Sequence, residues 1–414
     1  MNKKMKIYAV KTTSGQEETV ANFIASKTVS KNFPISSVLA LDSIKGYVFV
    51  EASAPHIVDE VSSGVRHSKG RAKGEIPLSE IEKFLIIKPV VEELNVNDIV
   101  EVTSGPFKGL KAKVIGEHGG RKLFKKLISS AERIIKLATL IKKVSPDIAI
   151  SFSSIEASRV SFGLNIPHYC VSDSPHAEAA SKLTVPLSKK LFTPFVIPKN
   201  VWSKYGIPKE NIIHYRALDP IVWLKNFKVD ENVLSMLNIN KNEPVVTVRP
   251  EEAFAAYLNK NLKETLIVEV VKLLTKKINA QIVVLPRYKE QISFFKRKLK
   301  EKNVKVVDKV VDGASLLASS SVFIGAGGTM IAEAALIGIP TISCFPSKPT
   351  YVEKFLIKQN LIKRSLNPKY IVKLALKYIE NKNIREEIAK KSKELISTME
   401  DPTKVILETI LKDK

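Results

Sequence analysis

The chain has 414 residues, enough for roughly two or three domains, and its 44% hydrophobic and 26% charged residues are typical of a folded globular protein. Cys170 and Cys344 lie far apart in the sequence, which argues against a disulfide framework and against any zinc or other metal site built on cysteines. No apolar run approaches the roughly 20 residues that span a bilayer, and the basic N-terminus leads into strand-like sequence, so we expect a cytoplasmic protein without a membrane span.

The net charge of +24 is unevenly distributed. Residues 1–115 contain 16 Lys+Arg and 13 Asp+Glu, or 16 − 13 = +3, which leaves 24 − 3 = +21 for the rest. Such a surplus is compatible with nucleic-acid contact. Stretches such as residues 294–302 (FFKRKLKEK) instead favour solvated helix faces, because no aromatic-rich binding motif is interleaved with the lysines.

The first predicted domain covers residues 5–86. Residues 6–12 (KIYAVKT) alternate as a half-buried strand does, and SGQE is a capping-box signature that predicts a helix with Ser14 as N-cap and Glu17 reaching back. Two further strands are predicted at residues 36–41 and 46–52, before a short helix. This order of elements predicts a small α+β domain.

Residues 7–27 (IYAVKTTSGQEETVANFIASK) and 38–52 (VLALDSIKGYVFVEA) carry a resemblance. They resemble the NGN domain of the archaeal NusG-like transcription elongation factor, the large subunit of the DSIF-type heterodimer. The resemblance implies binding to the RNA polymerase clamp, which favours processive elongation, and no cofactor. It also implies edge-to-edge strand pairing with a small zinc-binding partner subunit.

The same resemblance places the polymerase contact on Ala9, Tyr47 and Phe49. Tyr47 and Phe49 are two residues apart on one predicted strand, so they share a face, and the small Ala9 would leave a dent beside them. The alternative is that all three belong to the core. A basic stretch at residues 65–74 (VRHSKGRAKG) is predicted either to lie near nucleic acid or polymerase or to be a solvated loop.

Residues 97–115 (NDIVEVTSGPFKGLKAKVI) resemble the KOW motif of the same family. A complete KOW barrel needs about five strands, with tight glycine turns between them. The sequence changes character after residue 115. We therefore predict a partial KOW β-barrel over residues 87–115, open and with unpaired edges.

From residue 116 onward, short apolar strands alternate with long amphipathic helices, which predicts a doubly wound α/β fold. Within it, GAGGT at residues 325–329 follows a predicted strand and precedes a helix, the arrangement of an anion site. Gly325, Gly327 and Gly328 would let the backbone approach a diphosphate, Thr329 would cap the helix, and Glu333 would reach a ribose hydroxyl. The alternative is a tight strand–helix turn without a ligand.

The segment GAGGTMIAEAALIGIPTIS, together with SDSPHAE and RPEEAFAAY, resembles an archaeal family related to GT-B glycosyltransferases and UDP-N-acetylglucosamine 2-epimerase. The resemblance implies a first lobe over residues 116–234, a second over residues 235–400, and a UDP-sugar ligand. Arg249 follows a predicted strand where a phosphate contact would be useful. Asp173 and His176 are the plausible acid/base pair, with ordinary polar surface as the alternative, and His118 is a further candidate.

The chain departs from that family near residue 116, where the KOW-like segment gives way to the α/β region. The family begins with a strand, a helix, a second strand and a second helix before the HGG stretch at residues 118–120, and none of these is present. In a doubly wound lobe the first strand is central, so we predict a gap in the sheet, an incomplete first lobe and loss of catalysis.

Three hypotheses follow for the whole chain. It is a transcription elongation factor carrying an inactive glycosyltransferase-like region, or a nucleotide-sugar-dependent transferase or epimerase with a fused N-terminal module. The third is that the reading frame joins two genes through a deletion or a reading error, which is compatible with the first.

Overall fold

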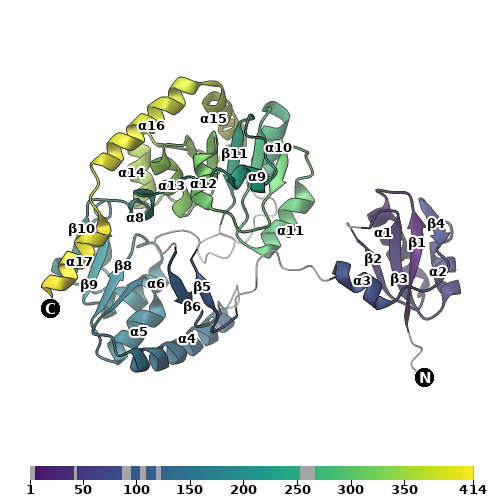
Figure 1. Ribbon diagram of the computed structural model, residues 1–414, viewed down its shortest axis with the longest axis horizontal. Helices are drawn as coiled ribbons and strands as arrows, with labels where there is room; N and C mark the ends of the chain where they lie inside the picture. The colour runs from purple at the N-terminus through teal and green to yellow at the C-terminus, as the bar shows by residue number, and fades with distance from the viewer. Residues whose placement is uncertain are drawn as a thin grey trace. The chain divides into compact units, whose positions relative to one another are not determined.

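A computed structural model describes residues 5–41, 44–85, 95–102, 109–117, 123–251 and 266–413. The chain divides into two compact units, Met1–Glu92 and Glu93–Lys414 (Figure 1). Residues 103–108 of the KOW-like segment and the candidate His118 lie outside the described residues.

The first unit is a small α+β domain, as predicted. Its elements are β1 (Lys6–Thr12), α1 (Glu17–Lys31), β2 (Ile35–Ala40), β3 (Tyr47–Ala52), α2 (Pro55–Ser62), β4 (Ser68–Arg71) and α3 (Leu78–Leu85). The strands form an antiparallel sheet in the order β2-β3-β1-β4. One face of this sheet, which includes Val10 and Val48, packs against Val20 and Ile24 of α1 and Val58 of α2.

The predicted capping box at the start of α1 is wrong. The N-cap is Gln16, which makes no side-chain cap hydrogen bond. The Glu17 carboxylate instead accepts the backbone N–H groups of Gly15, at 3.0 Å, and Gly46, at 2.6 Å. A tertiary contact explains the difference, because the Glu17 carboxylate accepts the N–H group of Gly46 in the loop that leads into β3.

The segment expected to form a partial barrel contributes two short strands. β5 (Ile99–Glu101) and β6 (Lys111–Lys113) pair antiparallel in a two-stranded sheet. Both strands belong to the second compact unit, Glu93–Lys414. No further strand joins this sheet among the described residues.

The first lobe of the second unit is a parallel α/β layer. Its helices and strands are α4 (Leu123–Val144), β7 (Ala149–Phe152), α5 (Ile155–Gly163), β8 (His168–Val171), α6 (Glu178–Thr184), β9 (Lys190–Pro194), α7 (Lys199–Ser203) and β10 (Ile212–Tyr215). The sheet order is β10-β9-β8-β7. Arg133 Nη2 of α4 forms an ion pair with Glu156 Oε1 of α5 at 2.5 Å, which links these two helices.

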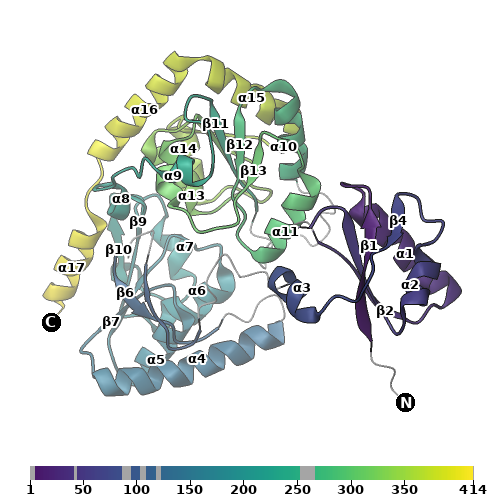
Figure 2. The same ribbon diagram turned by 45° about the vertical axis from the view of Figure 1, so that its right-hand side comes forward.

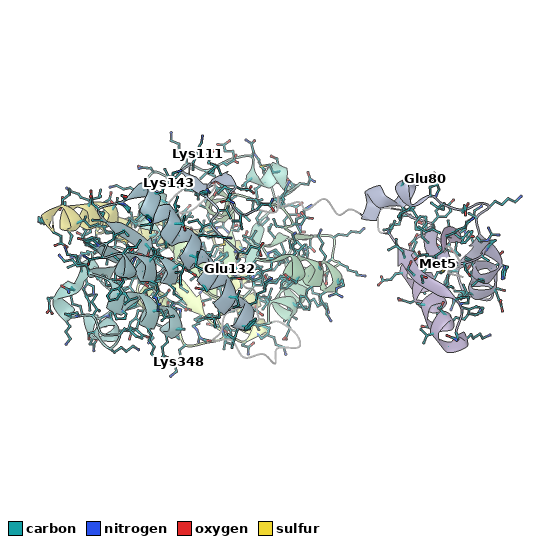
Figure 3. All side chains as sticks on the ribbon, turned by 90° about the horizontal axis from the view of Figure 1, so that it is seen from below. Met5, Glu80, Lys111, Glu132, Lys143 and Lys348 are labelled. Carbon is teal, nitrogen blue, oxygen red and sulfur yellow. The ribbon has the colours of Figure 1, made fainter. Side chains whose placement is uncertain are left out.

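The predicted gap in this sheet is wrong, because the four strands are contiguous, and among the described residues no further strand pairs beyond β7. A doubly wound sheet grows outward in two directions from its first strand, so loss of the first half removes one flank and leaves the other continuous. We call the exposed apolar side chains at this end the β7 flank: Ile150 (51% exposed) and Phe152 (49% exposed) of β7, and Phe124, Leu127 and Ile135 of α4. Figure 3 shows α4 along the surface of the unit, with Glu132 and Lys143 labelled on it.

The second lobe is larger and confirms the predicted doubly wound pattern. Its elements are α8 (Ile221–Leu224), α9 (Val233–Met236), β11 (Val245–Arg249), α10 (Leu266–Lys277), β12 (Gln281–Val284), α11 (Lys289–Lys298), β13 (Val304–Val306), α12 (Gly313–Ala318), β14 (Val322–Gly325), α13 (Thr329–Ile337), β15 (Thr341–Ser343), α14 (Tyr351–Lys358), β16 (Ile362–Arg364) and α15 (Pro368–Glu380). The strands form a six-stranded parallel sheet in the order β13-β12-β11-β14-β15-β16. Val246, Ile282, Ile324 and Ile342 are fully buried in its centre.

The chain then returns to the first lobe. α16 (Lys382–Ser397) leads into α17 (Pro402–Lys412), which lies beside the first-lobe sheet (Figure 2). Ile410 packs with Tyr169, Phe192 and Tyr215 of that sheet. Beyond the helix, the Asp413 carboxylate accepts hydrogen bonds from Lys190 Nζ at 2.5 Å and from Tyr169 Oη at 3.2 Å.

Candidate functional site

The glycine turn before α13 has the geometry of an anion site. Gly327 and Gly328 have φ of +101° and +90°, in the left-handed region that favours glycine. A Cβ atom on Gly327 would lie 2.6 Å from the Phe345 ring, and one on Gly328 would lie 2.8 Å from the Arg287 guanidinium. The N-cap is Gly328 and Thr329 is the first helical residue, so the expected capping by Thr329 is not seen. The first backbone N–H groups of a helix have no acceptor inside it, which leaves them for a ligand.

This turn lies in a cleft built from both lobes. The cleft has a volume of about 170 Å³. It is lined by Asp173, Ser174, His176, Asp219, Pro220, Gly327, Gly328, Thr329, Ile331, Ala332, Phe345, Thr350, Val352 and Glu353. Because typical small-molecule pockets measure roughly 300–1,000 Å³, the cleft would enclose only part of a nucleotide-sized ligand.

Five of the predicted ligand-site residues meet here. Asp173 and His176, on the loop after β8, line the same cleft as Gly327, Gly328 and Thr329. Burial lowers the pKa of His176, while Asp173 opposes that shift. The structure therefore joins the two segments that the sequence analysis treated separately, the acid/base pair and the glycine turn.

The other three predicted residues do not line the cleft. Gly325 ends β14, where a Cβ atom would lie 2.7 Å from the Phe323 ring, so its role is packing. Arg249 Nη1 donates to the carbonyl oxygens of Leu285, at 3.0 Å, and Pro286, at 3.1 Å. Glu333 accepts a hydrogen bond from Trp223 Nε1 at 2.9 Å, and burial raises the pKa of this carboxyl group.

Asp219 is a cleft residue that the sequence analysis missed. Its side chain is 6% exposed, and Tyr215 Oη donates a hydrogen bond to Oδ1. Burial, reinforced by the negative charge of Asp173, raises the pKa of Asp219 to about 7. Asp219 lies in the sequence Leu218-Asp219-Pro220, which matches no recognisable motif. The only sequence signal is a single acidic residue between a leucine and a proline.

In the first unit, the predicted docking residues lie on the sheet face opposite α1 and α2. Ala9 pairs with Phe49 across β1 and β3, and Lys11 pairs with Tyr47. Ala9 and Phe49 are buried together with Ile81 of α3. Only Tyr47, at 37% exposed, is open to solvent among the three docking candidates.

The basic stretch at residues 65–74 contains β4. Arg71 is engaged within the domain, since its Nε lies 2.9 Å from Asp59 Oδ1 and its guanidinium lies 5.7 Å from the centre of the Tyr8 ring. Arg66, Lys69 and Lys73 are exposed.

Neither a membrane-spanning helix nor a metal-ligand cluster occurs among the described residues. No helix there combines the length and apolar character needed to cross a bilayer. No group of three or more His, Cys, Asp and Glu side chains in the same ranges could hold a metal ion.

Comparison with known families divides the chain near residue 85. Residues 6–85 match the family described as "Early transcription elongation factor of RNA pol II, NGN section", and residues 85–413 match "Protein of unknown function (DUF354)". Transcription elongation factor Spt5 of Pyrococcus furiosus is 53% identical over 110 residues, 27% of this chain and 72% of that protein. An uncharacterized protein of Methanocaldococcus jannaschii is 34% identical over 303 residues, 72% of this chain and 83% of that protein.

Among solved structures, the UDP-GlcNAc 2-epimerase of Neisseria meningitidis bound to UDP-GlcNAc has a TM-score of 0.53 at 17% identity, covering 70% of this chain and 83% of that one. At this identity the likeness shows the fold, which is the GT-B-like arrangement predicted from sequence. The N-terminal homology supports a role in transcription elongation. The chain therefore belongs through its N-terminal region to the Spt5 family of transcription elongation factors, and through residues 85–413 to the DUF354 family.

Proposed function

We propose that the chain acts in transcription elongation by binding the RNA polymerase clamp through the Tyr47 side of its N-terminal sheet. The observation that carries this proposal is the exposure of Tyr47 beside Phe49 and Ala9, on the face that α1 and α2 leave free. An exposed aromatic ring at the rim of an apolar patch is a common anchor in protein interfaces. Membership of the Spt5 family supports the same role.

The burial of the neighbouring residues limits how a partner can bind. A clamp helix tip would contact Tyr47 first, because Ile81 covers Ala9 and Phe49. It would reach those two side chains only where α3 moves aside. We therefore assign the first contact to Tyr47 and a later, deeper contact to Ala9 and Phe49.

We also propose a small zinc-binding partner subunit of the Spt4 type, paired along β2. β2 lies at the end of the sheet order, so its outer edge is available for strand addition within the described unit. Exposed Arg66, Lys69 and Lys73 would lie near nucleic acid or polymerase.

The test is a charge placed on the proposed contact. Tyr47→Asp should weaken binding to archaeal RNA polymerase at least about tenfold, because a carboxylate would be buried against an apolar partner. Phe23→Asp is the matched control, since Phe23 is an exposed aromatic side chain on α1. Equal polymerase affinity of both variants would refute the docking face.

A second function is supported by the cleft of the second unit. We propose that it binds a nucleotide sugar without turning it over. Asp173 and His176 line it opposite the glycine turn, which supports binding. The sheet stops at β7, where the related fold would continue, which supports the lack of turnover.

Calorimetry of the full chain with UDP-GlcNAc tests this second proposal. Gly328→Ala should abolish measurable binding, because a Cβ atom would meet the Arg287 guanidinium and strain the left-handed backbone. Gly163→Ala is the control, since its Cβ atom would point into open space. Absence of UDP-GlcNAc binding in the folded chain, or hydrolysis or epimerisation of it, would contradict the proposal.

A further inference from the structure

We propose that the neutral carboxyl group of Asp219 donates a hydrogen bond from Oδ2 to an oxygen of the ligand in the cleft, so that binding requires this group to be protonated. The inference rests on the proposed binding of a nucleotide sugar and adds to it a proton-dependent contact on the first-lobe wall.

The two oxygens of Asp219 have different surroundings. Oδ1 accepts the hydrogen bond from Tyr215 Oη, which fixes the orientation of the carboxyl group. Oδ2 is buried and has no hydrogen-bond partner among the described residues. An unsatisfied buried polar atom is costly, and in a residue that lines the cleft a ligand is the available partner.

The charges around Asp219 favour its neutral form. Asp173, on the loop after β8, and Glu353, on α14, are the other acidic side chains that line the cleft. No Lys or Arg side chain lines the cleft within the described ranges, and the Arg287 guanidinium, which lies beside Gly328, donates to the Gly327 carbonyl oxygen at 3.3 Å. Arg364 Nε lies 3.8 Å from Glu353 Oε1, while Arg364 Nη2 donates to the carbonyl oxygens of Phe345 and Ser347, both at 2.9 Å. Tyr215 faces Asp219 from β10 and is fully buried.

Protonation at this position would decide whether an anion is accepted. The amide groups at the start of α13 attract a diphosphate, whereas ionised carboxylates on the opposite wall repel it. A neutral Asp219 removes one repulsive charge and supplies one donor. Burial raises the pKa of Asp219 to about 7, so Asp219 changes charge between pH 6 and 8, whereas burial lowers the pKa of His176 from its ordinary value.

UDP-GlcNAc is the suitable probe because its diphosphate diester keeps its charge between pH 6 and 8. Calorimetry of the full chain should show affinity about tenfold weaker at pH 8 than at pH 6, which is the change in the protonated fraction of one group with a pKa near 7. Asp219→Asn should bind within about twofold of the pH 6 value at both pH values, since its amide donates without titrating. Asp308→Asn, at an exposed ion pair with Lys296, is the matched control and should keep the tenfold fall.

A second variant covers the case in which Asp219→Asn does not fold. Tyr215→Phe removes the hydrogen bond that lowers the pKa of Asp219, so the midpoint of the affinity change should move to higher pH. An unmoved midpoint overturns the proposal.

The failures can be told apart. If the unmodified chain binds UDP-GlcNAc equally at pH 6 and pH 8, or if Asp219→Asn retains the tenfold fall, the role of Asp219 is refuted and nucleotide-sugar binding stands. If the folded chain binds no UDP-GlcNAc even at pH 6, nucleotide-sugar binding fails, and the role of Asp219 fails with it.

Discussion

The two parallel sheets of the second unit differ at their ends. The six-stranded sheet of the second lobe has fully buried central strands, with helices packed on both faces (Figure 1). The four-stranded sheet of the first lobe ends at β7, where Ile150 and Phe152 are half exposed. The difference shows that a four-stranded parallel sheet can stay continuous while its end strand leaves apolar side chains half exposed.

The largest contrast is expected from two isoleucine truncations. Ile324→Ala, at a fully buried position of β14, should lower the free energy of unfolding by about 2–5 kcal/mol, because it leaves a cavity. Ile150→Ala, on the β7 flank, should cost less than about 1 kcal/mol, because half of that side chain is already in water. Urea unfolding followed by circular dichroism measures both; equal losses would mean that the β7 flank is covered in solution.

The next largest effect concerns Asp219 and pH. The pKa of this acid is raised from 3.8 to about 7 in the folded chain, so the folded state holds the proton that the unfolded chain releases. Its stabilisation is complete below about pH 4 and is lost as pH rises toward 7. Asp219→Asn should therefore exceed the unmodified chain in unfolding free energy by on the order of 4 kcal/mol at pH 8, and by much less at pH 4.

Urea titrations at the two pH values give this measurement. A difference of the same size at pH 4 and pH 8 would mean that the pKa of Asp219 is the same in the folded and unfolded chain, which would contradict the raised value.

Two glycines at helix ends give a smaller contrast between the lobes. Gly338, after α13, has φ of +89°, and a Cβ atom there would lie 2.9 Å from Ala389 Cα. Gly338→Ala should cost at least about 1–2 kcal/mol, because alanine is strained in the left-handed region and the facing backbone must shift. Gly163→Ala at the end of α5 should be neutral or stabilising by up to about 1 kcal/mol. Thermal unfolding of the two variants compares them, and a cost at Gly163 would reveal a neighbouring group that contacts the end of α5.

The smallest stability effect is expected from Phe152→Ser. Half of the Phe152 side chain is exposed, so the change should alter unfolding free energy by about 1 kcal/mol or less. It should nevertheless reduce self-association at high protein concentration, because it shrinks an exposed apolar patch beside an unpaired strand edge. Light scattering checks this outcome. Unchanged self-association of the variant would mean that the chain associates through a surface other than the one around Phe152.

The sequence predicted the features that depend on neighbouring residues. Alternation and periodicity located the α+β domain and the doubly wound region, because these patterns follow directly from strand and helix geometry. The glycine turn before α13 was predicted for the same reason, since strand, glycines and helix are contiguous. Asp173 and His176 were found through their loop after β8.

The features that were missed depend on contacts across the fold. Glu17 does not form the expected capping box because its carboxylate accepts the N–H group of Gly46, 29 residues away. Glu333 is occupied by Trp223, 110 residues earlier in the chain, so its local position one turn into α13 misled the prediction. Asp219 joins the site only because the two lobes face each other at the cleft. The predicted gap in the first-lobe sheet was wrong because the sequence of a strand does not determine its position in the sheet.

The position of α17 has a consequence for the synthesis of this protein. The first-lobe sheet is covered in part by Ile410, and Tyr169 reaches its partner Asp413 across 244 residues of chain. A ribosome releases the first-lobe strands long before this cover exists, so Tyr169, Phe192 and their neighbours stay exposed until the final helix emerges. The first lobe should then mature only after residues 402–413 have left the ribosome, and nascent chains stalled before residue 402 should depend on chaperones.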